Sequence, residues 1–152
     1  MRERDRQQKF LVESCDVRGR LVQLDDTWRD ATARTAYPAV VKQILGEAFV
    51  AATLLASTIK YEGKMPMQVR GDGPIHLLVV QVTNEGSVRG LARWTDEPND
   101  KKLMSAFGTE ARMIISIEAS KYAEPYQGIV PLEGDCLAEA LQTYFKTSEQ
   151  LP

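Results

Sequence analysis

The segment from Pro38 to Gly63 constrains the fold more than any other, because it has the length and composition of one long helix. Proline suits the first turn of a helix, where its missing N–H would have no partner, and the glycine is a natural stop. From Ala48 to Ala56 the single polar side chain is Thr53. A helix that is apolar all round is buried on every side, so the rest of the chain is expected to wrap around this one.

Charge and hydropathy argue against two classes of partner. A membrane-spanning helix needs about 20 apolar residues, but Glu47 and Lys60 leave an uncharged run of twelve in this segment. The chain carries 19 basic and 21 acidic side chains, and its formal charge of -2 gives no overall field that would hold a phosphate backbone. We therefore expect neither membrane insertion nor nucleic-acid binding.

Apolar segments on both sides of this helix predict strands. Asn84-Glu85-Gly86 has the length and the terminal glycine of a hairpin turn, which indicates antiparallel pairing. The expected strands are 17–24, 67–71, 74–83, 87–95 and 112–118, followed by a further strand within 128–134. Short helices are expected at 27–36 and 101–108, and a closing helix from 136, with Asp135 as its N-cap. This pattern predicts the α+β class, with a single domain in which mainly antiparallel β-sheets wrap a long buried central helix and additional short helices complete the fold.

The two cysteines, Cys15 and Cys136, do not form a metal-binding pattern. They stand far apart, and neither belongs to a Cys-x-x-Cys or Cys–His pair with the spacing of a zinc site. The first ten residues alternate charges of opposite sign, where a secretion signal needs a basic start followed by an apolar run. We therefore expect a cytoplasmic chain with reduced thiols and no metal.

The sequence contains no recognisable catalytic constellation. His76 is the one histidine of the chain and lies in an apolar strand, without the Gly-x-Ser-x-Gly elbow of a serine hydrolase. The loop of residues 70–74, Arg-Gly-Asp-Gly-Pro, offers backbone N–H groups to a phosphate, but no helix follows it as in phosphate-binding glycine loops. A tight connection between two strands is the favoured interpretation, and we do not expect an enzyme.

Six segments nevertheless form a specific combination that resembles a known family. They are VRGRLV (17–22), AVVKQILGEAFVAATLLASTIKYEG (39–63), MQVRGDGPIHLLVV (67–80), VRGLARW (88–94), YQGIVPLEGD (126–135) and LAEALQTYFKTSEQLP (137–152). Together they are similar to the N-terminal domain of the bacterial thirty-three-kilodalton heat-shock protein, a redox-regulated chaperone that works without ATP. The resemblance covers nearly the whole chain.

The resemblance implies a holdase, which binds exposed apolar surface of unfolded or misfolded client proteins and prevents their aggregation. Such a protein needs no nucleotide, so no cofactor is expected in this chain. In the family, a linker and a C-terminal zinc module with a Cys-x-Cys and a Cys-x-x-Cys pair carry the redox switch. This chain lacks those cysteines, so we expect zinc only in that module and expect residues 1–152 to be a truncated client-binding and dimerisation domain.

The client-binding surface is expected on the sheet, because its strands carry more apolar residues than one buried face requires. The candidates are Leu78, Val80, Val82, Trp94, Met113, Ile115 and Ile117. Packing on the central helix is the alternative for each of them, since alternation assigns two faces to a strand without telling which face is outward.

The resemblance also implies a homodimer whose subunits share or exchange strands. We expect its contact near the end of the closing helix, at Ser148, Glu149 and Gln150. Two other functions stay open: a small-molecule enzyme or binding module that uses the 70–74 loop, and a purely structural dimerisation module.

Overall fold

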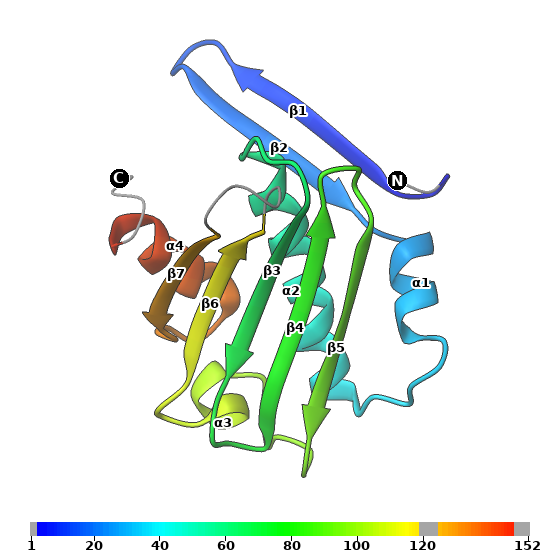
Figure 1. Ribbon diagram of the computed structural model, residues 1–152, viewed down its shortest axis with the longest axis vertical. Helices are drawn as coiled ribbons and strands as arrows, with labels where there is room; N and C mark the ends of the chain where they lie inside the picture. The colour runs from blue at the N-terminus through cyan, green and yellow to red at the C-terminus, as the bar shows by residue number, and fades with distance from the viewer. Residues whose placement is uncertain (1–2, 119–124, 148–152) are drawn as a thin grey trace.

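The computed structural model describes residues 3–118 and 125–147, which form two antiparallel sheets flanked by helices (Figure 1). The elements in chain order are β1 (Arg6–Val12), β2 (Val17–Gln23), α1 (Asp26–Thr32), α2 (Ala39–Ser57), β3 (Lys64–Arg70), β4 (Ile75–Thr83), β5 (Val88–Trp94), α3 (Leu103–Phe107), β6 (Arg112–Ile117), β7 (Tyr126–Pro131) and α4 (Leu137–Thr147). The predicted α+β class and its mainly antiparallel pairing are confirmed.

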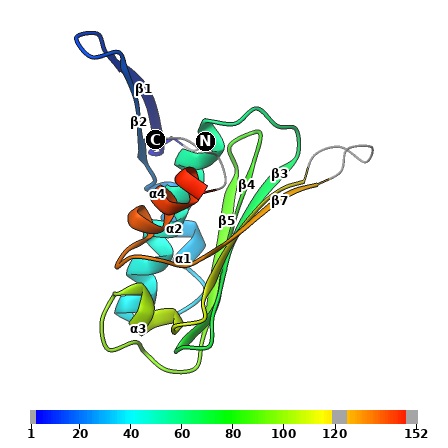
Figure 2. The same cartoon turned by 90° about the vertical axis from the view of Figure 1, so that its left-hand side faces the viewer.

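The larger sheet has five strands in the order β5-β4-β3-β6-β7, and each neighbouring pair is antiparallel. The predicted turn between β4 and β5 is confirmed, since Gly86 has a φ of 90° and its N–H donates to the Thr83 carbonyl at 3.0 Å. Helices α1 to α4 lie on one side of this sheet, whereas no described helix covers the other side (Figure 2). We call the helix side the covered face and the opposite side the open face.

Helix α2 runs along the covered face and supplies much of the core. Its buried residues are Val41, Ile44, Leu45, Ala48, Phe49, Ala52, Thr53, Leu55 and Ala56. By length and composition alone this helix is able to cross a membrane, a test that the core helix of a soluble protein also passes. More than half of the tested stretch is buried inside the domain, which is the position of a core helix.

Two expectations for this helix are wrong in detail. It ends at Ser57 rather than near Gly63, because the hydroxyls of Ser57 and Thr58 donate to backbone carbonyls three residues earlier, at 2.6 and 2.8 Å, and compete with the helical hydrogen bonds. It is also not buried on every side. Val50 and Leu54 are partly exposed, since neither the sheet nor α4 covers this stripe of the helix completely.

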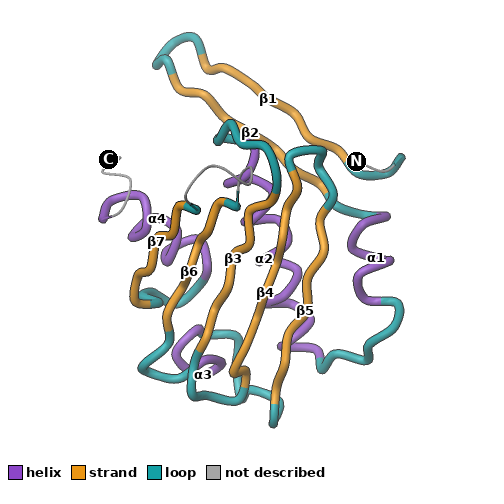
Figure 3. Tube along the Cα trace, in the orientation of Figure 1, coloured by secondary structure: helices purple, strands orange, loops and turns teal. Residues whose placement is uncertain are grey.

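The hairpin of β1 and β2 projects from one end of the domain as a separate two-stranded sheet (Figures 1 and 3). The sequence pattern predicts β2 but not β1. The reason is physical: every residue of β1 is exposed, so its sequence RQQKFLV carries none of the alternation that a half-buried strand shows.

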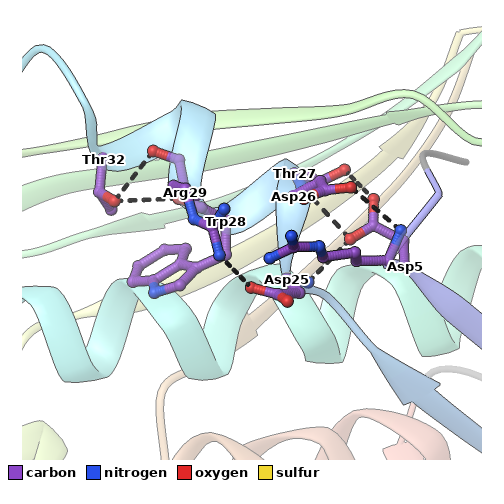
Figure 4. A network of polar contacts seen from close by, with 8 residues as sticks. Asp5, Asp25, Asp26, Thr27, Trp28, Arg29 and Thr32 are labelled. Atoms are coloured by element: carbon purple, nitrogen blue, oxygen red, sulfur yellow. Dashed lines mark hydrogen bonds and ion pairs between the residues drawn. The ribbon is translucent and has the colours of Figure 1, made fainter.

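Asp5 anchors this hairpin to the start of α1 (Figure 4). Its carboxylate, 7% exposed, accepts hydrogen bonds from the backbone N–H groups of Asp25 at 2.8 Å and Thr27 at 3.3 Å, and from the Thr27 hydroxyl. The side chain of Asp25 makes no cap bond of its own, and Asp5, twenty positions earlier, accepts from the N–H of this N-cap residue and from the first-turn N–H of Thr27.

Candidate functional site

All seven residues predicted to bind clients lie on the covered face, so the expectation that they form an outward surface is wrong. Leu78, Val80, Met113 and Ile115 have no exposed area, and Val82 is 3% exposed. Trp94 and Ile117 are partly buried and pack against the same core. In the structure these side chains pack beneath the helices, which was the alternative interpretation of the sequence.

The physical reason is that the predicted residues lie one position along each strand from the residues that face outward. In β4 and β6 apolar residues follow one another, so each strand offers an apolar set to both faces, and the helices lie over one of these faces (Figure 2). The polar residues were the available signal. Gln81, which is partly exposed, alternates with Val79 in β4 and assigns this set to the face without helices.

The open face carries a row of side chains across its five strands, and four of the five are apolar. Register places Leu91 opposite Val79, Val79 opposite Gln68, Gln68 opposite Ile114, and Ile114 opposite Ile129. Leu91 is 39% exposed and Ile129 is 52% exposed, at the two ends of the row. Gln68 interrupts it at the centre. We call these five residues the apolar row.

A second row on the open face is basic. Arg93 lies opposite Leu77, Leu77 opposite Arg70, and Arg70 opposite Arg112. All three arginines are exposed, and none forms an ion pair with another residue in 3–118 or 125–147. The Arg70 Nε donates to the Gln68 Oε1 at 3.2 Å, which connects the two rows. We call the three arginines the basic row.

A separate apolar groove lies between α2 and α4. It has a volume of about 540 Å³, and Val50, Leu54 and Leu141 are among its lining residues. Cys136, which is partly buried, also lines the groove. This groove explains the partial exposure of α2 on the side away from the sheet.

The loop of residues 70–74 is a tight connection between β3 and β4, as predicted. The Gly71 N–H donates to the His76 carbonyl at 3.3 Å, and the Gly73 N–H donates to the Phe107 carbonyl at 2.9 Å. A Cβ on Gly71 would lie 2.0 Å from that Phe107 carbonyl oxygen, so the loop packs tightly against the end of α3. Two N–H groups that a bound phosphate would need are therefore already bonded within the protein.

The remaining candidate residues are dispersed. His76 is exposed at an irregularity in the pairing of β4 with β5. Cys15 is exposed in the turn of the hairpin, far along the chain from Cys136. The described residues contain no group of three His, Cys, Asp or Glu side chains that could hold a metal ion. Ser148, Glu149 and Gln150 lie outside the described residues.

This protein belongs to the class of antiparallel α+β domains, with helices on one face of its five-stranded sheet and the apolar row on the other. The family model described as "Hsp33 protein" matches residues 5–152. The chain therefore belongs to the Hsp33 family.

The relatives include the 33 kDa chaperonin of Nitrosococcus oceani, which is 46% identical over 99% of this chain and 52% of its own length. The 33 kDa chaperonin of Vibrio cholerae is 44% identical over 94% of this chain and 49% of its own length. The chain thus spans about half the length of the curated relatives that it matches. The crystal structure of the 33 kDa chaperonin from Thermotoga maritima shares the fold, with a TM-score of 0.75 at 24% identity over 93% of this chain and 50% of that one.

Proposed function

We propose that this chain is the client-binding part of a holdase, an ATP-independent chaperone that keeps unfolding proteins from aggregating. The observation that carries the proposal is the apolar row on the open face, in a member of a family whose relatives are named 33 kDa chaperonin. The clients are unfolded or misfolded proteins, and binding requires no reaction and no nucleotide.

A holdase needs accessible apolar area rather than a reactive group, and the open face offers such area on a rigid support. Four strand spacings of about 4.8 Å give the apolar row a width of about 19 Å. Exposed apolar patches mark interaction surfaces in soluble proteins, and here Leu91 with Val79, and Ile114 with Ile129, form two such pairs on either side of Gln68. Val79 and Ile114 lie on strands that both pair with β3, so they are held in place before a client arrives.

Suppression of aggregation tests this function. We expect the chain to reduce the light scattering of a heat-denatured client, and we expect Ile114→Ser combined with Ile129→Ser to weaken this suppression several-fold. Met104→Ser is the matched control, because Met104 is an exposed apolar side chain, 67% accessible, on α3 rather than on the sheet. Absence of suppression by the unaltered chain, or an equal loss in the control, contradicts the proposal.

Redox control belongs, on this proposal, to the whole protein rather than to the described residues. The family pattern assigns it to a zinc module with four cysteines, and Cys15 and Cys136 do not match those positions. We further propose that the protein works in the cytoplasm, catalyses no reaction, and binds neither nucleic acid nor membrane. Holdase activity of this chain is then expected to be the same under reducing and oxidising conditions.

We also propose a homodimer in which a second copy covers the apolar face of the β1–β2 hairpin. Register places Phe10, Val12, Val17 and Leu21 on one face of this hairpin, and they are 50%, 39%, 50% and 59% exposed. An isolated two-stranded sheet is marginally stable in water, and exposed strand edges favour pairing with another chain. Both facts support a contact between copies at this hairpin.

Sedimentation velocity at micromolar concentration tests the dimer. The unaltered chain is expected to sediment at twice its mass of 17.0 kDa, whereas Phe10→Ser combined with Leu21→Ser is expected to shift it to the monomer. A monomer at every concentration contradicts the dimer. A dimer that persists in the double variant would mean that the contact lies elsewhere, for example at the predicted Ser148–Gln150 end.

A further inference from the structure

The basic row lies beside the apolar row on a protein whose formal charge is -2, so its positive charge is a local feature of the open face. We propose that this row makes client binding selective for charge: the open face prefers apolar segments that are bordered by Asp or Glu. This inference rests on the proposed holdase function and adds the chemistry of the segments that it binds.

The arrangement of the arginines is unfavourable for the isolated domain. Arg70 and Arg112 are direct partners on neighbouring strands, and like charges in that position repel each other. No described acidic side chain forms an ion pair with either of them. A client carboxylate that binds at these arginines relieves the repulsion, so the complex gains a favourable electrostatic interaction that the free domain lacks.

The two sides of the apolar row differ in charge. On the side of the basic row lie Arg93, Arg70 and Arg112, whereas the next row on the opposite side contains Gln81, Ser116 and Gln127, with Arg89 at its edge. A client segment that lies over the apolar row therefore meets concentrated positive charge along one border. This asymmetry favours a segment with acidic residues along one side.

The distances suit such a segment. Successive rows on one face of a strand are about 7 Å apart, and an extended client chain rises about 3.3 Å per residue. In a client chain that runs along the strands, an acidic residue about two positions from an apolar one therefore lies over the basic row when the apolar side chain lies over Val79 or Ile114. The guanidinium group is planar and weakly hydrated, so it binds carboxylates in pairs of hydrogen bonds while its stem covers apolar surface.

The expected preference is moderate, because each exposed ion pair is weak. Three such contacts together correspond to a preference of about tenfold in affinity. The preference is expected to decline with salt, since charges at the surface are screened over about 10 Å at 0.1 M ionic strength and over about 3 Å at 1 M.

Two labelled peptides of about twelve residues provide the probe, a length that more than spans the sheet in extended form. Both contain the same apolar residues, and the flanking positions are Glu in one peptide and Lys in the other. Fluorescence anisotropy with the full chain is expected to give about tenfold tighter binding of the Glu peptide at low salt. The triple variant Arg70→Gln, Arg93→Gln, Arg112→Gln is expected to abolish that difference.

The matched control is Arg34→Gln, Lys42→Gln, Lys101→Gln, which removes the same number of exposed positive charges outside the sheet. It is expected to keep the preference for the Glu peptide. Equal binding of both peptides, or loss of the preference in the control, overturns charge selection while the holdase function stands. If neither peptide binds and a heat-denatured client still aggregates, the holdase function itself fails and this inference fails with it.

Discussion

The covered and open faces of the five-stranded sheet come from alternate residues of the same strands. On β4, Leu78 and Val80 are fully buried while Val79 between them is partly exposed. On β6, Ile115 is fully buried and Ile114 is not. Residue type is the same on both sides, so the difference in role comes from the cover of each face: helices on one and no described helix on the other (Figure 2).

This comparison shows that one apolar strand can supply both stability and recognition. Apolar residues under α2 contribute free energy of folding because they leave water when the chain folds. The neighbouring residues on the open face stay in partial contact with water. They gain the free energy of burial only when a client covers them. Substitutions on the two faces should therefore separate the two properties.

The largest expected effect is the difference in stability between the variants Leu78→Asp and Val79→Asp. A carboxylate at position 78 would be buried without a partner, which costs several kcal/mol against a total stability of about 5 to 15 kcal/mol. We expect Leu78→Asp to lose cooperative thermal unfolding by circular dichroism. Val79→Asp is expected to keep it, because this side chain lies on the open face beside the basic row. Loss of folding in both variants would mean that the two faces are equally buried.

The next effect concerns adjacent positions on β5. A Cβ on Gly90 would lie 2.5 Å from the Val79 carbonyl oxygen and 2.9 Å from the ring of Phe49, so Gly90→Ala forces the β4 backbone and this ring to shift. We expect a loss of about 1 to 3 kcal/mol in urea unfolding. Leu91→Ala, on the open face, is expected to change stability by less than about 0.5 kcal/mol. Similar losses in both variants would contradict the assignment of the two faces.

The fold is predictable from the sequence where one physical signal dominates. The apolar run around Phe49 predicts the core helix, and the Asn84-Glu85-Gly86 turn predicts the antiparallel pair β4–β5. The outward face is not predictable from hydrophobicity, because the pairs Leu78–Val79 and Ile114–Ile115 are apolar on both faces. The polar partners on the same strands carry the missing information. The basic row is not visible either, since residues 70, 93 and 112 meet only through strand register.

A third prediction extends the comparison to the β1–β2 hairpin, which lies outside both faces. Asp5→Asn removes the charge that accepts two N–H groups at the start of α1, so we expect a loss of about 1 kcal/mol. Hydrogen exchange should accelerate in β1 and β2 while β3 and β4 keep their protection. Equal acceleration in the five-stranded sheet would show that the hairpin and the sheet unfold as one unit.

The smallest effect lies at the margin of the covered face, where the Tyr61 hydroxyl donates to the Val82 carbonyl at 3.0 Å. Burial raises the pKa of Tyr61 above its ordinary value of 10.0. The folded state therefore holds this proton more tightly than the unfolded state does. The stability from this difference is fully present below pH 10 and is lost as the pH rises through the higher pKa of the folded state.

Tyr61→Phe removes this titration together with the hydrogen bond. The stability difference between the unaltered chain and the variant is therefore expected to be constant at neutral pH and to shrink above about pH 10. Urea unfolding of both proteins from neutral to alkaline pH measures it, and comparison with the variant cancels the titration of the lysines and of the other tyrosines. A difference that stays constant through alkaline pH would mean that the Tyr61 hydroxyl is as accessible to water as a side chain on the open face.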